Sequence, residues 1–103
     1  MKVLKTYKLP NDRIYRIVDT EKPYKLGYPE INSGAEHHTM STGIRIDSCM
    51  GTWWGHISSC ETLDDALQTL LLFIRQRVPI GSTAESYLQQ YEIASISLTD
   101  DSN

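Results

Sequence analysis

The sequence has little of several features that mark common classes of protein. It has two cysteines in 103 residues, too few for a disulfide framework, and we expect both thiols to be reduced inside a cell. No apolar run approaches the roughly 20 residues that a membrane-spanning helix needs. No charged start followed by an apolar stretch indicates a secretory signal. These absences predict a cytoplasmic protein with no membrane segment.

Motifs for catalysis and phosphate binding are also missing. The chain contains no G-x-x-x-x-G-K-[ST] phosphate loop. Cys49 or Cys60 near His56 offers a conceivable nucleophile and base, but no nucleophile motif surrounds them. The potential metal ligands lack the short spacing of a zinc site, namely His37, His38, Cys49, His56 and Cys60. We therefore expect no enzyme, no metal and no cofactor, and we rank a metal-binding or thiol-dependent enzyme last.

The charge is small and unevenly distributed. The net charge is −3, which argues against general binding to polyanions. Residues 1–25 carry seven Lys or Arg and three acids, whereas residues 26–103 carry three Arg and ten acids. Basic strands with interleaved tyrosines define an alternative function, nucleic-acid binding by an N-terminal hairpin that uses Lys5, Lys8, Arg13 and Arg16. We rank it second, because lysines on edge strands also serve to discourage aggregation.

The best-defined element is an amphipathic helix between Thr62 and Pro79. Apolar residues recur at helical spacing and predict a helix over 63–77, with Thr62 as the N-cap and Pro79 ending it. Leu71 and Leu72 widen the apolar stripe beyond one face, so a second cover is needed. We expect that cover to come from a later part of the chain. The other interpretation is a homodimer through Leu71 and Leu72.

Alternating apolar and polar residues predict the strands of a sheet. Strands are expected over 3–9 and 14–18, joined by a Pro-Asn-Asp turn, and over 43–47 and 52–58. In the third strand we expect Arg45 and Asp47 to point outward. A capping box of Ser82 and Glu85 predicts a second, shorter helix, and alternation over 94–98 predicts a last strand.

The order of these elements defines the fold class. It reads ββ-loop-ββααβ, a single α+β domain over residues 1–99 with a frayed polar tail at 100–103. We expect a mainly antiparallel sheet of about five strands with one long and one short helix on one face. Residues 55–74, GHISSCETLDDALQTLLLFI, resemble the strand-to-helix step of HicB-type antitoxins in capping and leucine spacing. The rest of the chain departs from that pattern, so no family is assigned.

Protein binding is the function that the sequence favours. The irregular stretch over 20–42 is long for a compact domain, and such loops commonly carry function. Tryptophan and tyrosine are typical anchors of protein interfaces. The expected contact set is Tyr24, Tyr28, Glu30, Glu36, Trp53 and Trp54. We predict an adaptor, a regulator or an inhibitor, including the phage-type inhibitor of a nucleic-acid-handling complex, with another protein as its partner.

Overall fold

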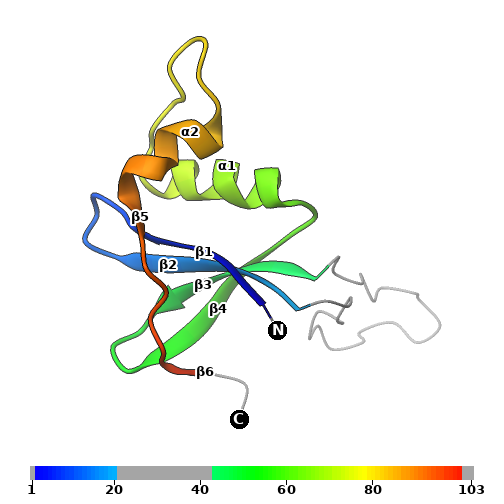
Figure 1. The fold of residues 1–103 in the computed structure, drawn as a ribbon, viewed down its shortest axis with the longest axis vertical. Coiled ribbons are helices and arrows are strands. Elements are labelled where there is room, and N and C mark those ends of the chain that lie inside the picture. The colour runs from blue at the N-terminus through cyan, green and yellow to red at the C-terminus, as the bar shows by residue number, and fades with distance from the viewer. Residues whose placement is uncertain (1, 21–42, 101–103) are drawn as a thin grey trace, which may run out of the picture.

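The computed structural model of the chain describes residues 2–20 and 43–100. Five strands form an antiparallel sheet: β1 (Lys2–Lys8), β2 (Ile14–Asp19), β3 (Ile44–Cys49), β4 (Trp53–Cys60) and β5 (Glu92–Ile93). Two helices pack against it, α1 (Leu63–Phe73) and α2 (Ala84–Leu88), the latter continued by the 3-10 turn η1 (Gln89–Tyr91) (Figure 1). A two-residue strand, β6 (Thr99–Asp100), adds to β4 in parallel. The α+β fold class is confirmed.

Both hairpins have turn chemistry that fixes their register. In the first, Leu9 N donates to Arg13 O and Asp12 N donates to Leu9 O, each at 3.0 Å. Asp12 has φ 64, as expected at the last position of a three-residue loop. In the second hairpin Gly51 has φ 85, and Met50 N donates to Trp53 O at 2.8 Å. That pattern matches a two-residue type II′ turn, which suits the twist of the strands.

One face of the sheet carries the hydrophobic core beneath the helices. Tyr7, Ile17 and Ile46 are fully buried on this face and pack in one cluster with α1 and α2. Leu71 belongs to the same cluster and is only 3% exposed, so the second face of α1 is covered by the chain itself. Leu72, in contrast, is 73% exposed. The expectation of intramolecular cover holds for Leu71 and not for Leu72.

The long helix is shorter than predicted. Thr62 caps it as expected, because its Oγ1 accepts from Asp65 N at 3.1 Å. The helix ends at Phe73, however, and the prediction that it extends to residue 77 is wrong. Arg75 has φ 52, its N donates to Leu72 O, and Gln76 N donates to Leu71 O. These two bonds form a Schellman motif, which satisfies the final carbonyls and turns the chain away.

Two predictions about the C-terminal part are also corrected. The cap of α2 is Thr83, whose Oγ1 accepts from Ser86 N at 3.0 Å, and not Ser82. Ser82 is used in the preceding turn, where its N donates to Pro79 O. Residues 94–98 form no strand. They run from β5 beside β1 to β6 beside β4, at opposite edges of the sheet, so they must cross it (Figure 1). None of the helices in the described part of the chain has both the length and the apolar character to cross a membrane.

Candidate functional site

Strand β4 places its two tryptophans on opposite faces of the sheet. Neighbouring side chains on a strand point to opposite sides, and the environments of these two differ completely. Trp54 is fully buried on the face that carries no helix, whereas Trp53 on the other face is 42% exposed. The sequence placed both among the contact residues, and the structure separates them into an interior and a surface residue.

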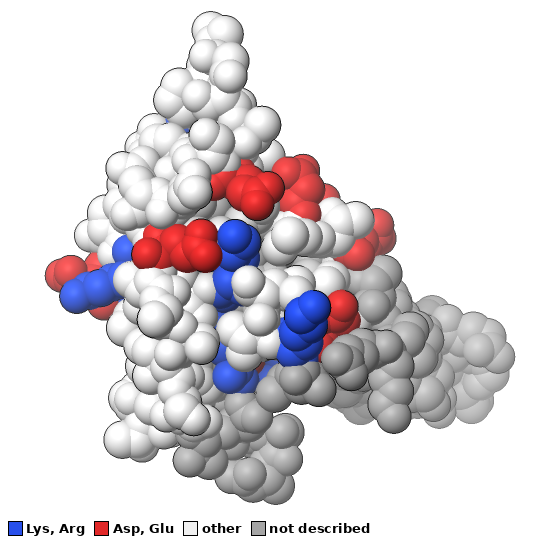
Figure 2. Space-filling view, viewed as in Figure 1, with Lys and Arg blue, Asp and Glu red and all other residues white. Residues whose placement is uncertain are grey.

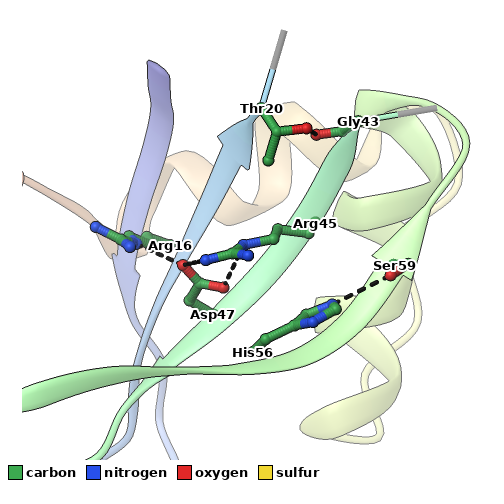
Figure 3. A network of polar contacts seen from close by, with 7 residues as sticks. All are labelled: Arg16, Thr20, Gly43, Arg45, Asp47, His56 and Ser59. Carbon is green, nitrogen blue, oxygen red and sulfur yellow. Dashed lines mark hydrogen bonds and ion pairs between the residues drawn. The ribbon is translucent and has the colours of Figure 1, made fainter. Parts of the chain in front are cut away.

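Trp54 contacts a buried cluster of charged side chains on the helix-free face, Arg16, Arg45 and Asp47. Figure 3 shows these three charged residues. The guanidinium carbon of Arg16 lies 4.6 Å from the centre of the Trp54 ring, within the range of a cation–π interaction. Arg16 Nε donates to Asp47 Oδ2 at 2.8 Å. Arg16, Asp47 and Trp54 are each at least nine-tenths buried. The cluster therefore joins β2, β3 and β4 from the side opposite the core.

Arg45 is the second cation on the same carboxylate. Its Nε lies 3.0 Å from Asp47 Oδ1, and its Nη2 donates to Asp47 Oδ2 at 3.4 Å. The short Nε–Oδ1 approach is an ion pair without hydrogen-bond geometry, because both atoms lack a hydrogen-bond partner among the residues described. One carboxylate thus neutralises parts of two guanidinium groups. Buried charges of this kind persist only when they are paired.

The prediction that Asp47 points to solvent is wrong for a physical reason. Alternation correctly places Arg45 and Asp47 on the face opposite Ile46, but that face is also buried at this position. Alternation of apolar and polar residues shows which side chains share a face of the strand, but it does not show whether that face is exposed to solvent. The arginine directly opposite Asp47 in the register, Arg16, is the signal that the sequence analysis missed.

Two other polar contacts lie near this cluster (Figure 3). His56 Nε2 and Ser59 Oγ lie 3.1 Å apart on β4. At the end of β2, Thr20 N and Thr20 Oγ1 both donate to Gly43 O, at 2.8 and 3.0 Å. The second contact lies just beyond the Asp19–Ile44 pair, so the hydrogen bonding between the two chain segments continues one residue past β2 and β3.

The exposed Trp53 lies at the turn of the second hairpin together with Met50. A Cβ added at Gly55 would lie 3.1 Å from Trp53 Cζ3 and 3.0 Å from Met50 Cγ. Both side chains therefore lie directly over the backbone of Gly55, which has no side chain to displace them. Met50 is 38% exposed, so the two residues form a small apolar surface. We call Met50, Trp53 and Gly55 the tryptophan platform.

The remaining predicted contact residues, Tyr24, Tyr28, Glu30 and Glu36, lie outside the described residues. The four basic residues of the alternative site do not converge. Lys5 forms an ion pair with Glu92 at 3.4 Å, and Arg16 is buried against Asp47. Lys8 and Arg13 are exposed. On the face shown in Figure 2, basic side chains are separated by acidic and uncharged ones.

Of the five potential metal ligands, His37 and His38 lie outside the described residues, and the other three are Cys49, His56 and Cys60. Within residues 2–20 and 43–100, no three His, Cys, Asp or Glu residues gather in a way that could hold a metal ion. Cys60 is buried and Cys49 is partly exposed. Burial raises the pKa of the Cys60 thiol, and hydrogen bonds with Ser58 and Thr69 oppose the rise. A raised pKa lowers the thiolate fraction and hence the nucleophilicity of this sulfur.

No family model, no curated protein and no solved structure matches the chain.

Proposed function

We propose that this protein is a non-enzymatic binding module whose contact surface for another protein is centred on Trp53. The observation that carries the proposal is the contrast between two neighbouring tryptophans. Trp54 is fully buried, while Trp53 leaves 42% of its surface in solvent. Tryptophan is the side chain most enriched among residues that dominate binding energy. A large apolar ring left on the surface of a small domain therefore favours a contact role.

The rigidity of the platform supports the same proposal. Trp53 follows a tight two-residue turn, and its carbonyl accepts a hydrogen bond from Met50 N. The next residue, Trp54, is held by Arg16 within the buried charge cluster. An aromatic ring on an anchored strand loses little conformational entropy when it binds, which favours affinity. Met50 adds an adaptable apolar neighbour of the kind used on binding surfaces.

The test is quantitative capture with Trp53→Ala and a matched control. Wild-type protein and both variants are used as bait in extracts of the native cell, and the captured proteins are quantified. Ile57→Ala is the control, because Ile57 lies on the same strand and is equally exposed at 40%. Truncating an interface anchor costs about 2 kcal/mol or more, or roughly 30-fold in affinity. Trp53→Ala should therefore lose a protein that wild type and Ile57→Ala retain.

The captured protein is then purified and titrated against each variant. Trp53→Ala should weaken binding by the expected factor while its melting temperature stays close to wild type. Gly55→Ala should weaken binding to a smaller degree, since the added methyl displaces the ring without removing it. A partner that binds Trp53→Ala as tightly as wild type would place the contact surface elsewhere.

A further inference from the structure

A small pocket lies where the turn between β1 and β2 meets the end of α1. It has a volume of about 300 Å³ and is lined by Pro10, Asn11, Phe73, Ile74 and Arg75. Each of the two turns that form it holds a non-glycine residue in the left-handed region, Asp12 with φ 64 and Arg75 with φ 52. No other non-glycine residue within 2–20 and 43–100 has a positive φ. Such outliers are a reason to look for a function at the place where they meet.

One wall of the pocket is apolar and held in place. The Phe73 side chain is 38% exposed, and its ring packs against that of Tyr15 with the centroids 5.4 Å apart. Asn11 Nδ2 donates to the Tyr15 hydroxyl at 3.0 Å, and Asn11 Oδ1 accepts from Arg13 N at 3.0 Å. Pro10, next to Asn11, is exposed. Phe73 and Pro10 therefore offer flat, preorganised surfaces to an aromatic ring.

Arg75 is the charged residue among the described residues that line the pocket. Its side chain is exposed, and none of the acids within residues 2–20 and 43–100 forms an ion pair with it. The fold uses its backbone, because Arg75 N donates to Leu72 O in the turn that ends α1. Glycine would serve in that turn without the steric strain of a side chain at positive φ. The turn therefore does not need the guanidinium group, which is left available to a ligand.

We propose that this pocket binds a small aromatic carboxylate, with its ring against Phe73 and Pro10 and its carboxylate paired with Arg75. A guanidinium group matches a carboxylate through two parallel hydrogen bonds. A cavity of roughly 150 Å³ accommodates benzene, so about 300 Å³ leaves room for one ring and a carboxylate arm. The end of α1 is the negative end of the helix dipole and disfavours an anion. The charge of Arg75 is therefore necessary to hold the ligand there.

The pocket is separate from the tryptophan platform, so the proposal goes beyond the function assigned to Trp53. The two sites share no residue. In the sheet Tyr15 pairs with Ser48, and Ser48 pairs with Gly55. Two strand spacings of about 4.8 Å place Gly55 roughly 10 Å from Tyr15. Trp53→Ala should therefore leave binding at the pocket unchanged.

The experiment is a titration of the full chain with phenylacetate at constant pH and ionic strength, followed by NMR of the backbone amides. A ligand of this size should bind with a dissociation constant of about 1–10 mM. The largest shifts should fall on Asn11, Ile74 and Arg75, which line the pocket. Phenylacetamide has nearly the same shape without the charge and should bind about 5-fold more weakly. Hexanoate keeps the charge without the ring and should also bind more weakly.

Two variants of Arg75 separate the ligand from the fold. Arg75→Gln removes the charge and should weaken phenylacetate by about 5-fold. Arg75→Gly should weaken it to the same degree and raise the melting temperature by about 4–8 °C, because the strain at φ 52 is relieved. Arg77→Gln is the matched control, since Arg77 is exposed and lines a different groove with Gln68 and Leu72. It should bind phenylacetate as wild type does.

Several results would overturn the proposal. They are an absence of shifts at the pocket up to about 50 mM phenylacetate, equal affinity for phenylacetate and phenylacetamide, and an Arg75→Gln variant that binds as wild type does. N-acetyl-glycyl-phenylalanine carries the same ring and carboxylate at the end of a peptide. If it binds more tightly than phenylacetate, the pocket recognises a peptide C-terminus and the assignment to a small carboxylate is wrong.

Discussion

Replacing Asp47 with asparagine removes one negative charge from between two arginines and leaves the side-chain volume nearly unchanged. The Asp47 side chain is completely buried, that of Arg16 is 6% exposed and that of Arg45 is 12% exposed. The substitution therefore leaves two guanidinium groups with little access to water and without their counter-charge. Removing one partner of a buried ion pair costs about 3–5 kcal/mol.

The lower end of that range is expected here. Arg45 is the less buried of the two cations, and a small movement would bring its head group into water. Arg16 has no such freedom, because it lies between Asp47 and the ring of Trp54. We therefore expect Asp47→Asn to lower the free energy of unfolding by about 3 kcal/mol, a large share of the 5–15 kcal/mol typical of a domain. The melting temperature should fall by about 12–24 °C.

The assay is urea denaturation followed by tryptophan fluorescence, with thermal unfolding by circular dichroism. Asp12→Asn is the matched control, because Asp12 is exposed and asparagine also tolerates its positive φ. It should change the free energy of unfolding by no more than about 0.5 kcal/mol. The combination Arg16→Met, Arg45→Met and Asp47→Leu should recover most of the loss, since apolar replacement of a buried ion cluster is often neutral. A loss below about 1 kcal/mol in Asp47→Asn would refute the buried pairing.

Two further positions test other features of the fold. Burial, with smaller contributions from Glu92 and Glu85, raises the pKa of Tyr7 to about 12. Because the folded pKa lies above the usual value near 10, this group's contribution to stability is complete below pH 10 and is lost as pH rises toward 12. The free energy of unfolding of Tyr7→Phe should therefore fall less steeply with pH than that of wild type between pH 10 and 12. At pH 7 it should cost little, because the buried hydroxyl has no hydrogen-bond partner among the described residues; a large loss there would contradict this account. Arg75→Gly should raise the free energy of unfolding by about 1 kcal/mol, since glycine adopts φ 52 without strain. Arg77→Gly, measured at the same low concentration, should not, and an equal gain in both variants would exclude the conformational explanation.

Local chemistry predicted most of the fold. The three-residue turn, the N-cap at Thr62 and the alternation of β2 and β3 each depend on neighbours in sequence, and each is found in the structure. The errors concern the end of α1, the start of α2, the last strand and the burial of Asp47. The turn at Arg75 contains no glycine that would indicate the end of the helix. The helical spacing of the sequence continues beyond Phe73, so the predicted helix was too long. The last strand was misplaced because residues 94–98 alternate in sequence like a strand yet cross the sheet between its two edges, a difference that depends on tertiary contacts.

The candidate site was predicted less completely. The sequence indicated that Trp53 and Trp54 point to opposite faces of the sheet, but it could not predict which of them is buried. Alternation separates the two faces without showing what covers each one. Trp54 is buried and its ring contacts Arg16, a residue 38 positions away in the sequence. The same contact explains why Arg16 looked like part of a basic surface. Its charge is evident in the sequence, whereas its burial depends on Asp47.

The buried cluster also bears on the choice between the two binding functions. Binding to nucleic acid requires cations that can reach phosphates and release counterions. Of the four basic residues assigned to that function, Arg16 is committed to Asp47 and Lys5 lies beside Glu92. Lys8 and Arg13 are exposed, and two cations supply little of the charge that such binding uses. The ring of Trp53 is uncharged and 42% exposed, and its burial by another protein would gain free energy directly. The arrangement of these side chains therefore favours the tryptophan platform over the basic hairpin.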